Sequence, residues 1–248
     1  MQKNRAKILS LVPSWTETFL AAGMDVVGRT RFCIHPEALV KNIPAVGGTK
    51  HISTDEILNL KIDAAILDRE ENKKEMADFL TDCGIEIIDS HVLSLNDAGD
   101  FLEKCAARFA NPALQKYSRD YFRLSEQKFS KEKFENLAII RRNAPLPDGP
   151  VRYVIWRRPF MAVSNGTYIA DVLARFDIQL VSSETEKYPV VSDEDIKKTY
   201  SLFSTEPYPF TKDFEQLSSQ GYRGALIDGE KISWYGVRSL KFLQECAQ

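Results

Sequence analysis

The chain is poor in cysteine and histidine and has little charge imbalance. It holds four cysteines and three histidines among 248 residues, and no two cysteines form a C-x-x-C pair. The wide spacing of Cys33, Cys83, Cys105 and Cys246 indicates neither a zinc cage nor a disulfide framework, so we interpret them as reduced, mostly structural thiols. A formal net charge of -2 gives no reason to expect nucleic acid or an anionic membrane as a partner.

Long apolar runs are also missing. The longest one near the start is Ile8 to Val12, interrupted by Ser10. It is shorter than the roughly 7 to 15 apolar residues of a secretory signal and the roughly 18 of a membrane span. The sequence as written therefore predicts no export signal, no membrane insertion and a cytoplasmic location, whereas removal of a signal would make the protein periplasmic or otherwise extracytoplasmic.

Signatures of common enzymes are absent too. The sequence has no G-x-S-x-G, P-loop, G-x-G-x-x-G or H-E-x-x-H motif. Ser14 with His35 or His51 and Asp68 can be combined into a triad on paper, but any chain of this length offers such a combination. We therefore expect a protein that is not an enzyme, with an enzyme acting on a bound chelate as the weakest alternative.

Short strands rich in β-branched residues alternate with helices in two blocks, and 44% of the residues are hydrophobic. This alternation predicts an α/β fold of two lobes, with parallel sheets flanked by helices. The predicted strands are 8–12, 26–30, 64–68 and 86–90, then 151–156, 178–183, 201–204 and 224–228. The predicted helices are 15–22, 54–60, 70–83 and 95–109, then about 166–176, 193–198, 212–220 and 236–246.

The segment between the blocks, residues 111–142, has no internal Gly or Pro after Pro112. Asn111 can cap a helix whose first position is Pro112, and roughly 30 helical residues would make a rod of about 45 Å. The sequence thus predicts an N-terminal lobe (1–110), one long connecting helix (111–142) and a C-terminal lobe (143–248). A single stiff connector suggests a ligand cleft between the lobes that opens only slightly.

Trp15 stands at the first turn of a predicted helix, in the stretch SLVPSWTETFLAAG. Ser14 and Glu17 have capping-box spacing, as do Ser53 and Glu56. We interpret Trp15 as one wall of the cleft, presented by a capped helix start. The alternative is that the indole is a hydrophobic plug between the lobe and the connector.

Ligands of parallel α/β sheets bind beyond the carboxyl ends of the strands. The residues that follow the predicted strands include all three tryptophans, all three histidines and several arginines. Aromatic faces supply area and Arg supplies planar donors, which suits a large, partly flat ligand with carboxylates, amides or other acceptors. The expected stacking residues are Trp15, Phe32, Trp156, Phe160, Tyr188 and Trp234. The expected guanidinium contacts are Arg31, Arg69, Arg157 and Arg238.

The motifs SLVPSWTETFLAAG, VVGRTRFCIHP and VGGTKHISTDEILNLKIDAAILDREEN resemble the N-terminal lobe of class III substrate-binding proteins of ABC importers. The similarity continues in WRRPFMAVSNGTYIADVLARF, EKYPVVSDEDI, STEPYPF and DGEKISWYG, and so covers nearly the whole chain. It is strongest to the branch related to the periplasmic cobalamin-binding protein, the helical-backbone metal receptors.

This resemblance implies a monomer of two α/β lobes joined by a long helix. It also implies a bound metal chelate, since members take cobalamin, haem or ferric siderophores and distant relatives take zinc or manganese ions. The aromatic positions that sandwich the corrin would fall on Phe32, near Phe160 and on Tyr188, and a further aromatic loop on Trp234 and Tyr235. Two other aromatic positions of the family are occupied by Thr49 and Asp68. With Ser14, these complete the expected ligand site.

The resemblance further implies docking onto an ABC permease through one acid on each lobe, here Asp55 or Glu56 and Glu194. Acids in a first helical turn also complement the helix dipole without any partner.

Two more alternatives stay open. A bare-metal receptor would use His35, His51 and His91, together with Cys33 or Asp68, but none of these shares a close spacing with another. An intracellular corrinoid carrier or sensor would keep the fold without a transporter. The preferred hypothesis is a receptor for a corrinoid or tetrapyrrole chelate, with ferric siderophore second and no intrinsic cofactor.

Overall fold

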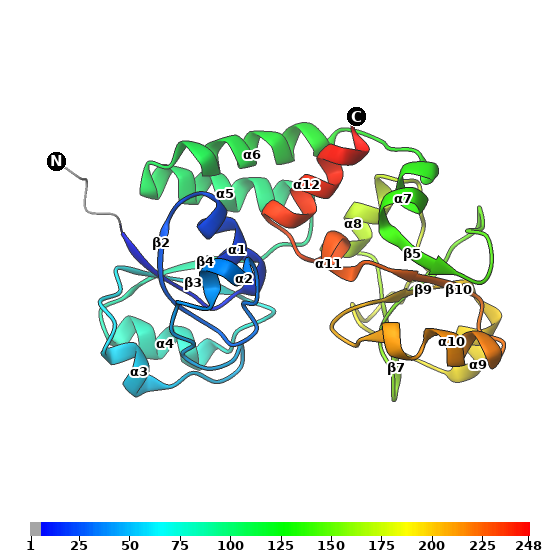
Figure 1. Ribbon diagram of the computed structural model, residues 1–248, viewed down its shortest axis with the longest axis horizontal. Helices are drawn as coiled ribbons and strands as arrows, with labels where there is room; N and C mark the ends of the chain where they lie inside the picture. The colour runs from blue at the N-terminus through cyan, green and yellow to red at the C-terminus, as the bar shows by residue number, and fades with distance from the viewer. Residues whose placement is uncertain (1–5) are drawn as a thin grey trace. The chain divides into compact units, whose positions relative to one another are not determined.

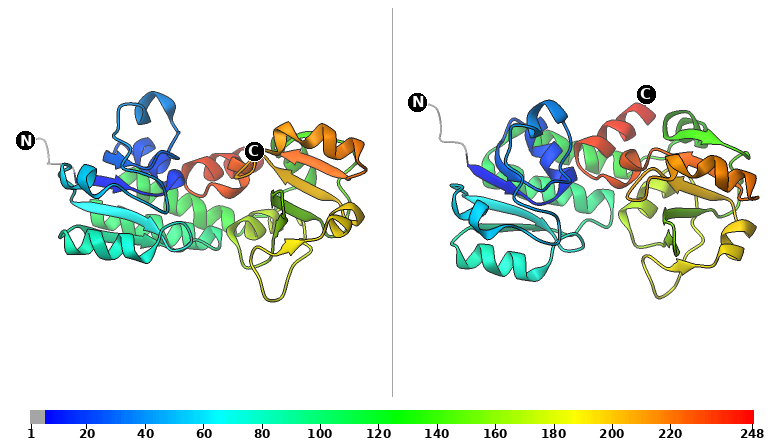
Figure 2. Two further views of the ribbon diagram at one scale, coloured as in Figure 1. Left: turned by 90° about the horizontal axis from the view of Figure 1, so that it is seen from below. Right: turned by 60° about the horizontal axis from the view of Figure 1, so that its bottom comes forward.

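The computed structural model describes residues 6–248, which form two compact units. Unit 1 comprises residues 6–92, 97–121 and 235–238, and unit 2 comprises residues 93–96, 122–234 and 239–248. Each unit has its own sheet with its own helices around it (Figures 1 and 2). The two units are described separately below, and the division of the sequence at residues 110 and 142 stays a prediction.

Unit 1 contains a four-stranded, entirely parallel sheet in the order β2-β1-β3-β4. Every residue of β3 is buried, because a central parallel strand is covered on both faces. Figure 1 shows α4 on one side of this sheet and α5 on the other. The strands are β1 (Lys7–Ser10), β2 (Asp25–Arg29), β3 (Ala64–Asp68) and β4 (Glu86–Ser90). The helices are α1 (Pro13–Ala21), α2 (Glu37–Val40), α3 (Thr54–Leu58), α4 (Lys74–Asp82) and α5 (Leu95–Phe109).

Helix α4 starts at Lys74 rather than at residue 70, because the chain after β3 turns back on itself. The carboxylate of Asp68 accepts a hydrogen bond from the amide of Glu70 at 2.9 Å, and Asn72 accepts one from the amide of Asp68 at 2.8 Å. These bonds give the loop local partners that a helix would otherwise supply. Met76 and Leu80 of α4 then complete a core over β1 and β3.

Unit 2 contains a six-stranded mixed sheet in the order β5-β10-β9-β6-β7-β8. Its centre, β10-β9-β6, is parallel as predicted, whereas β5, β7 and β8 pair antiparallel. The strands are β5 (Ile139–Arg142), β6 (Arg152–Trp156), β7 (Phe160–Val163), β8 (Val190–Val191), β9 (Ser201–Ser204) and β10 (Gly224–Ile227). The helices are α7 (Lys131–Ala138), α8 (Tyr168–Ala174), α9 (Asp193–Lys198), α10 (Phe214–Ser219) and α11 (Gly229–Ser233), with a short 3-10 helix at Phe210–Lys212.

The predicted strand 178–183 is wrong. Only one bridge forms there, from Val151 to Leu180, because β7 and not this segment takes the place beside β6. Two further helices, α6 (Pro112–Ser125) and α12 (Val237–Cys246), contribute residues to both units, as does α5, whose first two residues belong to unit 2.

The connecting segment 111–142 is not one continuous helix. Asn111 caps α6 as predicted, accepting from the amides of Ala113 and Leu114. Helix α6 ends at Ser125, where the guanidinium of Arg175 donates to the Ser125 carbonyl. The chain starts a new helix after Ser130, whose hydroxyl accepts from the Lys133 amide at 3.3 Å. A cap in mid-segment and a competing donor therefore divide the predicted rod into α6, α7 and β5.

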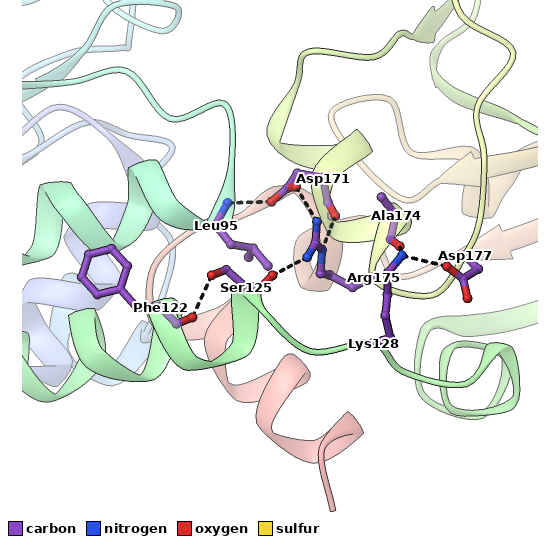
Figure 3. A network of polar contacts seen from close by, with 8 residues as sticks. All are labelled: Leu95, Phe122, Ser125, Lys128, Asp171, Ala174, Arg175 and Asp177. Atoms are coloured by element: carbon purple, nitrogen blue, oxygen red, sulfur yellow. Dashed lines mark hydrogen bonds and ion pairs between the residues drawn. The ribbon is translucent and has the colours of Figure 1, made fainter.

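One ion pair on α8 secures two helix ends in unit 2 (Figure 3). Asp171 accepts from the amide of Leu95, the first residue of α5, at 2.8 Å, and pairs with Arg175 at 3.2 Å. An acid at a helix N-terminus and a cation at a helix C-terminus both complement the helix dipole. Arg175 supplies the cation at the last carbonyl of α6.

We expect Asp171→Ala to lower the free energy of unfolding by about 1 to 2 kcal/mol, because the change removes an N-terminal cap and leaves Arg175 without its carboxylate. Urea unfolding followed by circular dichroism measures the change. The control is Asp177→Asn, which removes the exposed ion pair with Lys128 and suits the φ of 53° at this position. It should change stability by less than about 0.5 kcal/mol. Equal losses in the two variants would contradict the capping role.

Candidate functional site

Trp15 lies after β1 in unit 1 and is completely buried. Its ring stacks on Phe101 of α5 at 4.5 Å and packs against Tyr235 at 4.9 Å. Its indole N–H donates to the hydroxyl of Ser90 at 2.9 Å. The indole therefore offers no face to a ligand, and the expectation that Trp15 is a cleft wall is wrong. It is a buried hydrophobic plug, because α5 and the segment 235–238 pack against its ring.

Ser14 does not cap α1. The helix begins at Pro13 with Val12 at the cap position, so Ser14 lies inside the first turn and is buried. Ser53 does occupy the cap position of α3, but its side chain makes no capping hydrogen bond. The capping-box spacing is therefore present in both places without the capping geometry.

Asp68 is buried at the end of β3 and has a structural role. One carboxylate oxygen accepts from Ser90 at 2.7 Å, and the other holds the amide of Glu70. The hydroxyl of Ser90 thus links Asp68 to the indole of Trp15. Because these partners occupy Asp68, it is not the free ligand contact that was expected, and no triad with Ser14 forms. Thr49 is half-buried, and its carbonyl accepts from Asn72 at 3.0 Å.

The histidines do not assemble a metal site within the described residues, 6–248. No three His, Cys, Asp or Glu side chains in this part of the chain are grouped so that they could hold a metal ion. The thiol of Cys33 lies 3.0 Å from the hydroxyl of Thr16, and burial raises its pKa. Cys33 is thus a protonated, buried side chain and not a ready metal ligand.

Three of the four arginines expected to contact the ligand are held by carboxylates. Arg69 pairs with Asp89 at 2.7 Å, and Arg157 with Asp213 at 2.8 Å. Arg238 makes two bonds of 2.8 Å to the carboxylate of Glu17. The fourth, Arg31, is exposed and its guanidinium lies 4.9 Å from the ring centroid of Phe32.

Phe32 presents the main aromatic face at the carboxyl edge of the sheet in unit 1. It is 45% exposed, and a side chain at Gly48 would come within 3.3 Å of its ring. Because Gly48 has no side chain, the Phe32 ring has space beside it. Arg31 beside it adds a cation with free donors, so the pair presents both stacking area and charge to solvent.

Unit 2 exposes Trp156, at the end of β6, and Tyr188; they are 42% and 38% exposed. Trp156 contacts Tyr208 edge to face, with ring centroids 5.6 Å apart. The hydroxyl of Tyr208 donates to Asp213, the carboxylate that also binds Arg157. The exposed indole of Trp156 thus packs against Tyr208, and the bond to Asp213 holds Tyr208 in place. The loop at 205–213 therefore supplies a ring contact for Trp156.

Phe160, expected to stack on the ligand, is only 8% exposed. Its ring lies 5.8 Å from that of Tyr222, inside the core formed by β6, β9 and α10. The expectation of a fully available face at Phe160 is therefore wrong, because the first residue of β7 points into the core. Tyr235 is also buried, and its hydroxyl bonds to Glu71 at 3.2 Å.

Trp234 is half-buried in unit 2, where Glu206 holds its indole N–H at 2.6 Å. Ser233 donates to the same carboxylate. Burial raises the pKa of Glu206 above its ordinary value, and the nearby charges of Asp228 and Glu230 act in the same direction. Sequence reasoning missed Glu206, although it lies two residues after a correctly predicted strand, in STEPYPF. The available signal was an acidic residue among prolines and aromatic residues, where an unpaired charge is unusual.

The expected docking acids are exposed. Asp55 and Glu56 lie in the first turn of α3, and Glu194 lies in the first turn of α9, paired with Lys198 at 2.5 Å. Among residues 6–248, no helix has both the length and the apolar character needed to cross a bilayer.

Comparison with known proteins supports the resemblance noted in the sequence. No family model matches the chain. The chain is 28% identical over 148 residues to the vitamin B12-binding protein of Vibrio vulnificus, an alignment that covers 58% of this chain and 53% of that protein. The chain thus matches about half the length of the curated relatives.

Solved structures share the whole fold. The periplasmic vitamin B12-binding protein of Vibrio cholerae matches with a TM-score of 0.70 and 21% identity, covering 98% of this chain and 96% of that one. A periplasmic heme-binding protein from Pseudomonas aeruginosa matches with a TM-score of 0.73 and 18% identity, covering 98% and 91%. These likenesses confirm the predicted α/β fold and the predicted resemblance to binding proteins of this kind.

Replacing Glu206 by Gln should change how stability depends on pH. The raised pKa means that the folded state favours the protonated carboxyl, so the contribution of Glu206 is most favourable below about pH 4.5 and is lost as pH rises through its raised pKa. Gln keeps an acceptor for Trp234 but does not titrate. The stability of the wild type minus that of Glu206→Gln should therefore fall as the pH rises above about 4.5 in urea unfolding. Parallel pH profiles would show that the buried carboxyl is not perturbed.

Proposed function

We propose that the protein is a receptor that binds a metal chelate and delivers it to an ABC importer. The observation that carries this proposal is a set of exposed aromatic side chains: Phe32 in unit 1 and Trp156 in unit 2, at the carboxyl edges of their sheets, and Tyr188, which precedes β8 in unit 2. Exposed large aromatics of this kind are typical of binding surfaces. The same fold occurs in proteins described as vitamin B12-binding and heme-binding.

The proposed ligand is a corrinoid or another tetrapyrrole, with a ferric siderophore as the second candidate. A flat macrocycle matches flat aromatic faces, and the free guanidinium of Arg31 can bind a peripheral carboxylate or amide. A bare-metal ligand is disfavoured because residues 6–248 gather no three metal-binding side chains. An enzyme is disfavoured because the similar proteins are all described as binding or transport proteins.

We place the protein outside the cytoplasmic membrane, as a monomer that carries its ligand to a permease. The solved structures with this fold are described as periplasmic, which supports this location. An intracellular carrier or sensor of a corrinoid is the alternative. Fractionation of cells that produce the full natural protein separates the two, since a carrier would stay with the cytosol.

Truncation of the exposed aromatics should weaken chelate binding. We expect Phe32→Ala and Trp156→Ala each to cost about 1 to 3 kcal/mol, or roughly fivefold to a hundredfold in Kd, because each removes a stacking face. Isothermal titration with cyanocobalamin and with ferric protoporphyrin IX, in chelator-treated buffer, measures the effect. The control is Ile140→Ala, which removes a similarly exposed apolar side chain from β5 in unit 2.

The control variant should bind like the wild type. If the wild type binds neither chelate nor a ferric hydroxamate siderophore, the proposed function is wrong. If the wild type binds and both aromatic variants match it, the ligand does not use these faces.

The docking acids should affect transport without affecting binding. Replacing Glu56 and Glu194 by Gln removes two exposed negative charges and leaves the exposed aromatic side chains in place, so we expect unchanged chelate affinity. Uptake of the radiolabelled chelate by cells that depend on this receptor should fall by about tenfold, because charge pairs across an interface contribute on the order of 1 to 3 kcal/mol. Replacing Glu132 and Glu215 by Gln is the matched control. Equal uptake in the two double variants would contradict docking through α3 and α9.

A further inference from the structure

Unit 2 contains a cleft of about 950 Å³ beside the turn that joins β6 to β7. The turn residues Arg157, Arg158 and Pro159 form one wall, and β8 with the start of α9 forms another. This volume lies within the range of small-molecule sites, roughly 300 to 1,000 Å³. Arg157 and Phe160, which the sequence analysis expected to contact the ligand, both line this cleft.

The positive charges around the cleft differ in whether they have carboxylate partners. Arg157 pairs with Asp213, and Lys197 pairs with Asp193 at 3.1 Å. Asp193 also accepts from the hydroxyl of Tyr222. Arg158 is exposed and forms no hydrogen bond or ion pair within residues 6–248, although its charge contributes, with that of Arg157, to lowering the pKa of the Asp213 carboxyl. It therefore leaves the N–H donors of one guanidinium unused at the cleft.

The backbone at Arg158 is also unusual. Its φ is 73°, in the left-handed region that costs free energy for a residue with a Cβ atom. Gly or Asn would adopt this conformation more easily. Strained positions of this kind cluster at ligand sites, so the strain and the unused N–H donors indicate together that stability does not explain an arginine here.

The rest of the lining is apolar. Phe160, Val191 and Tyr222 are buried and form the inner surface, while Val190 is 63% exposed at the rim. An apolar surface next to one unpaired guanidinium suits an organic anion, with its skeleton on the apolar side chains and its carboxylate on the arginine.

We propose that this cleft holds a carboxylate side group of the ligand and that Arg158 is its contact, donating two parallel hydrogen bonds. The inference rests on the proposed function and narrows it to chelates that carry ionised carboxylates, such as a porphyrin with propionate groups. Chelates whose side groups are only amides would leave the guanidinium without its best partner.

The test compares ferric protoporphyrin IX, its dimethyl ester and cyanocobalamin on the full chain. Arg158→Asn removes the charge and suits the left-handed backbone, so it should fold at least as well as the wild type. Arg158→Lys keeps a charge without the bidentate fork. The matched control is Arg223→Gln, an exposed arginine of unit 2 outside the cleft lining.

We expect Arg158→Asn to weaken binding of ferric protoporphyrin IX about tenfold to a hundredfold, the range for a hydrogen bond to a charged group. Binding of the dimethyl ester should be weaker in the wild type and unchanged by the substitution. Arg158→Lys should recover part of the loss, and Arg223→Gln should match the wild type.

Three results would overturn the inference. If Arg158→Asn binds ferric protoporphyrin IX as the wild type does, or if the wild type binds acid and ester equally, Arg158 does not hold a carboxylate. If the wild type binds cyanocobalamin but not the porphyrin, the ligand class is wrong, and in all three cases the proposed receptor function stands. Failure of the wild type to bind any of the chelates, a ferric hydroxamate siderophore included, would instead remove the proposed function.

Discussion

Pairing between arginine and carboxylate decides which parts of this surface are available to a ligand. Arg69, Arg157 and Arg238 stand where strands end or chain segments meet, and each is held by an acid within 3 Å. A guanidinium in such a pair has few donors left and would lose its partner on binding anything else. An unpaired guanidinium near the end of a strand, such as that of Arg31, therefore carries more information about a ligand than the total number of arginines does.

The aromatic residues also divide into those held inside a unit by hydrogen bonds and those exposed to solvent. Trp15 and Trp234 have their indole N–H groups engaged by Ser90 and Glu206, so they belong to the framework of their units. Within residues 6–248 the indole N–H of Trp156 forms no such bond, and its ring is 42% exposed beside Tyr208. A fixed support lowers the cost of ordering a side chain when a ligand arrives, which favours affinity without adding contacts.

Much of the fold could be predicted from the sequence, because alternation of buried strands and amphipathic helices is a strong local signal. The segments 64–68, 86–90, 95–109, 193–198 and 201–204 were predicted to the residue. The errors lie where long-range contacts decide. Arg175, 50 residues away, ends the predicted connecting helix, and β7 displaces the predicted strand 178–183 from the sheet.

The candidate site was predicted less well, because a position after a strand identifies the right edge of the sheet but does not say whether a side chain points outward. Trp15, Asp68 and Phe160 are at that edge and buried, whereas Arg158 was overlooked beside Arg157 because nothing in the sequence says which of two adjacent arginines meets Asp213.

Stacking faces and free guanidinium groups contribute differently to ligand choice. An aromatic face binds any flat apolar body, so Phe32, Trp156 and Tyr188 favour macrocycles in general and distinguish poorly among them. A guanidinium discriminates by charge, because an ionised carboxylate gains roughly twice the hydrogen-bond strength that a neutral amide does. Each unit has one guanidinium without a hydrogen-bonded carboxylate near an exposed aromatic residue. In unit 1 Arg31 lies beside Phe32, and in unit 2 Arg158 is close to Trp156 in the chain. The aromatic faces accept many flat ligands. The charges of Arg31 and Arg158 would therefore decide between an anionic porphyrin and an amide-bearing corrinoid, and the aromatic residues that carry the family resemblance would not.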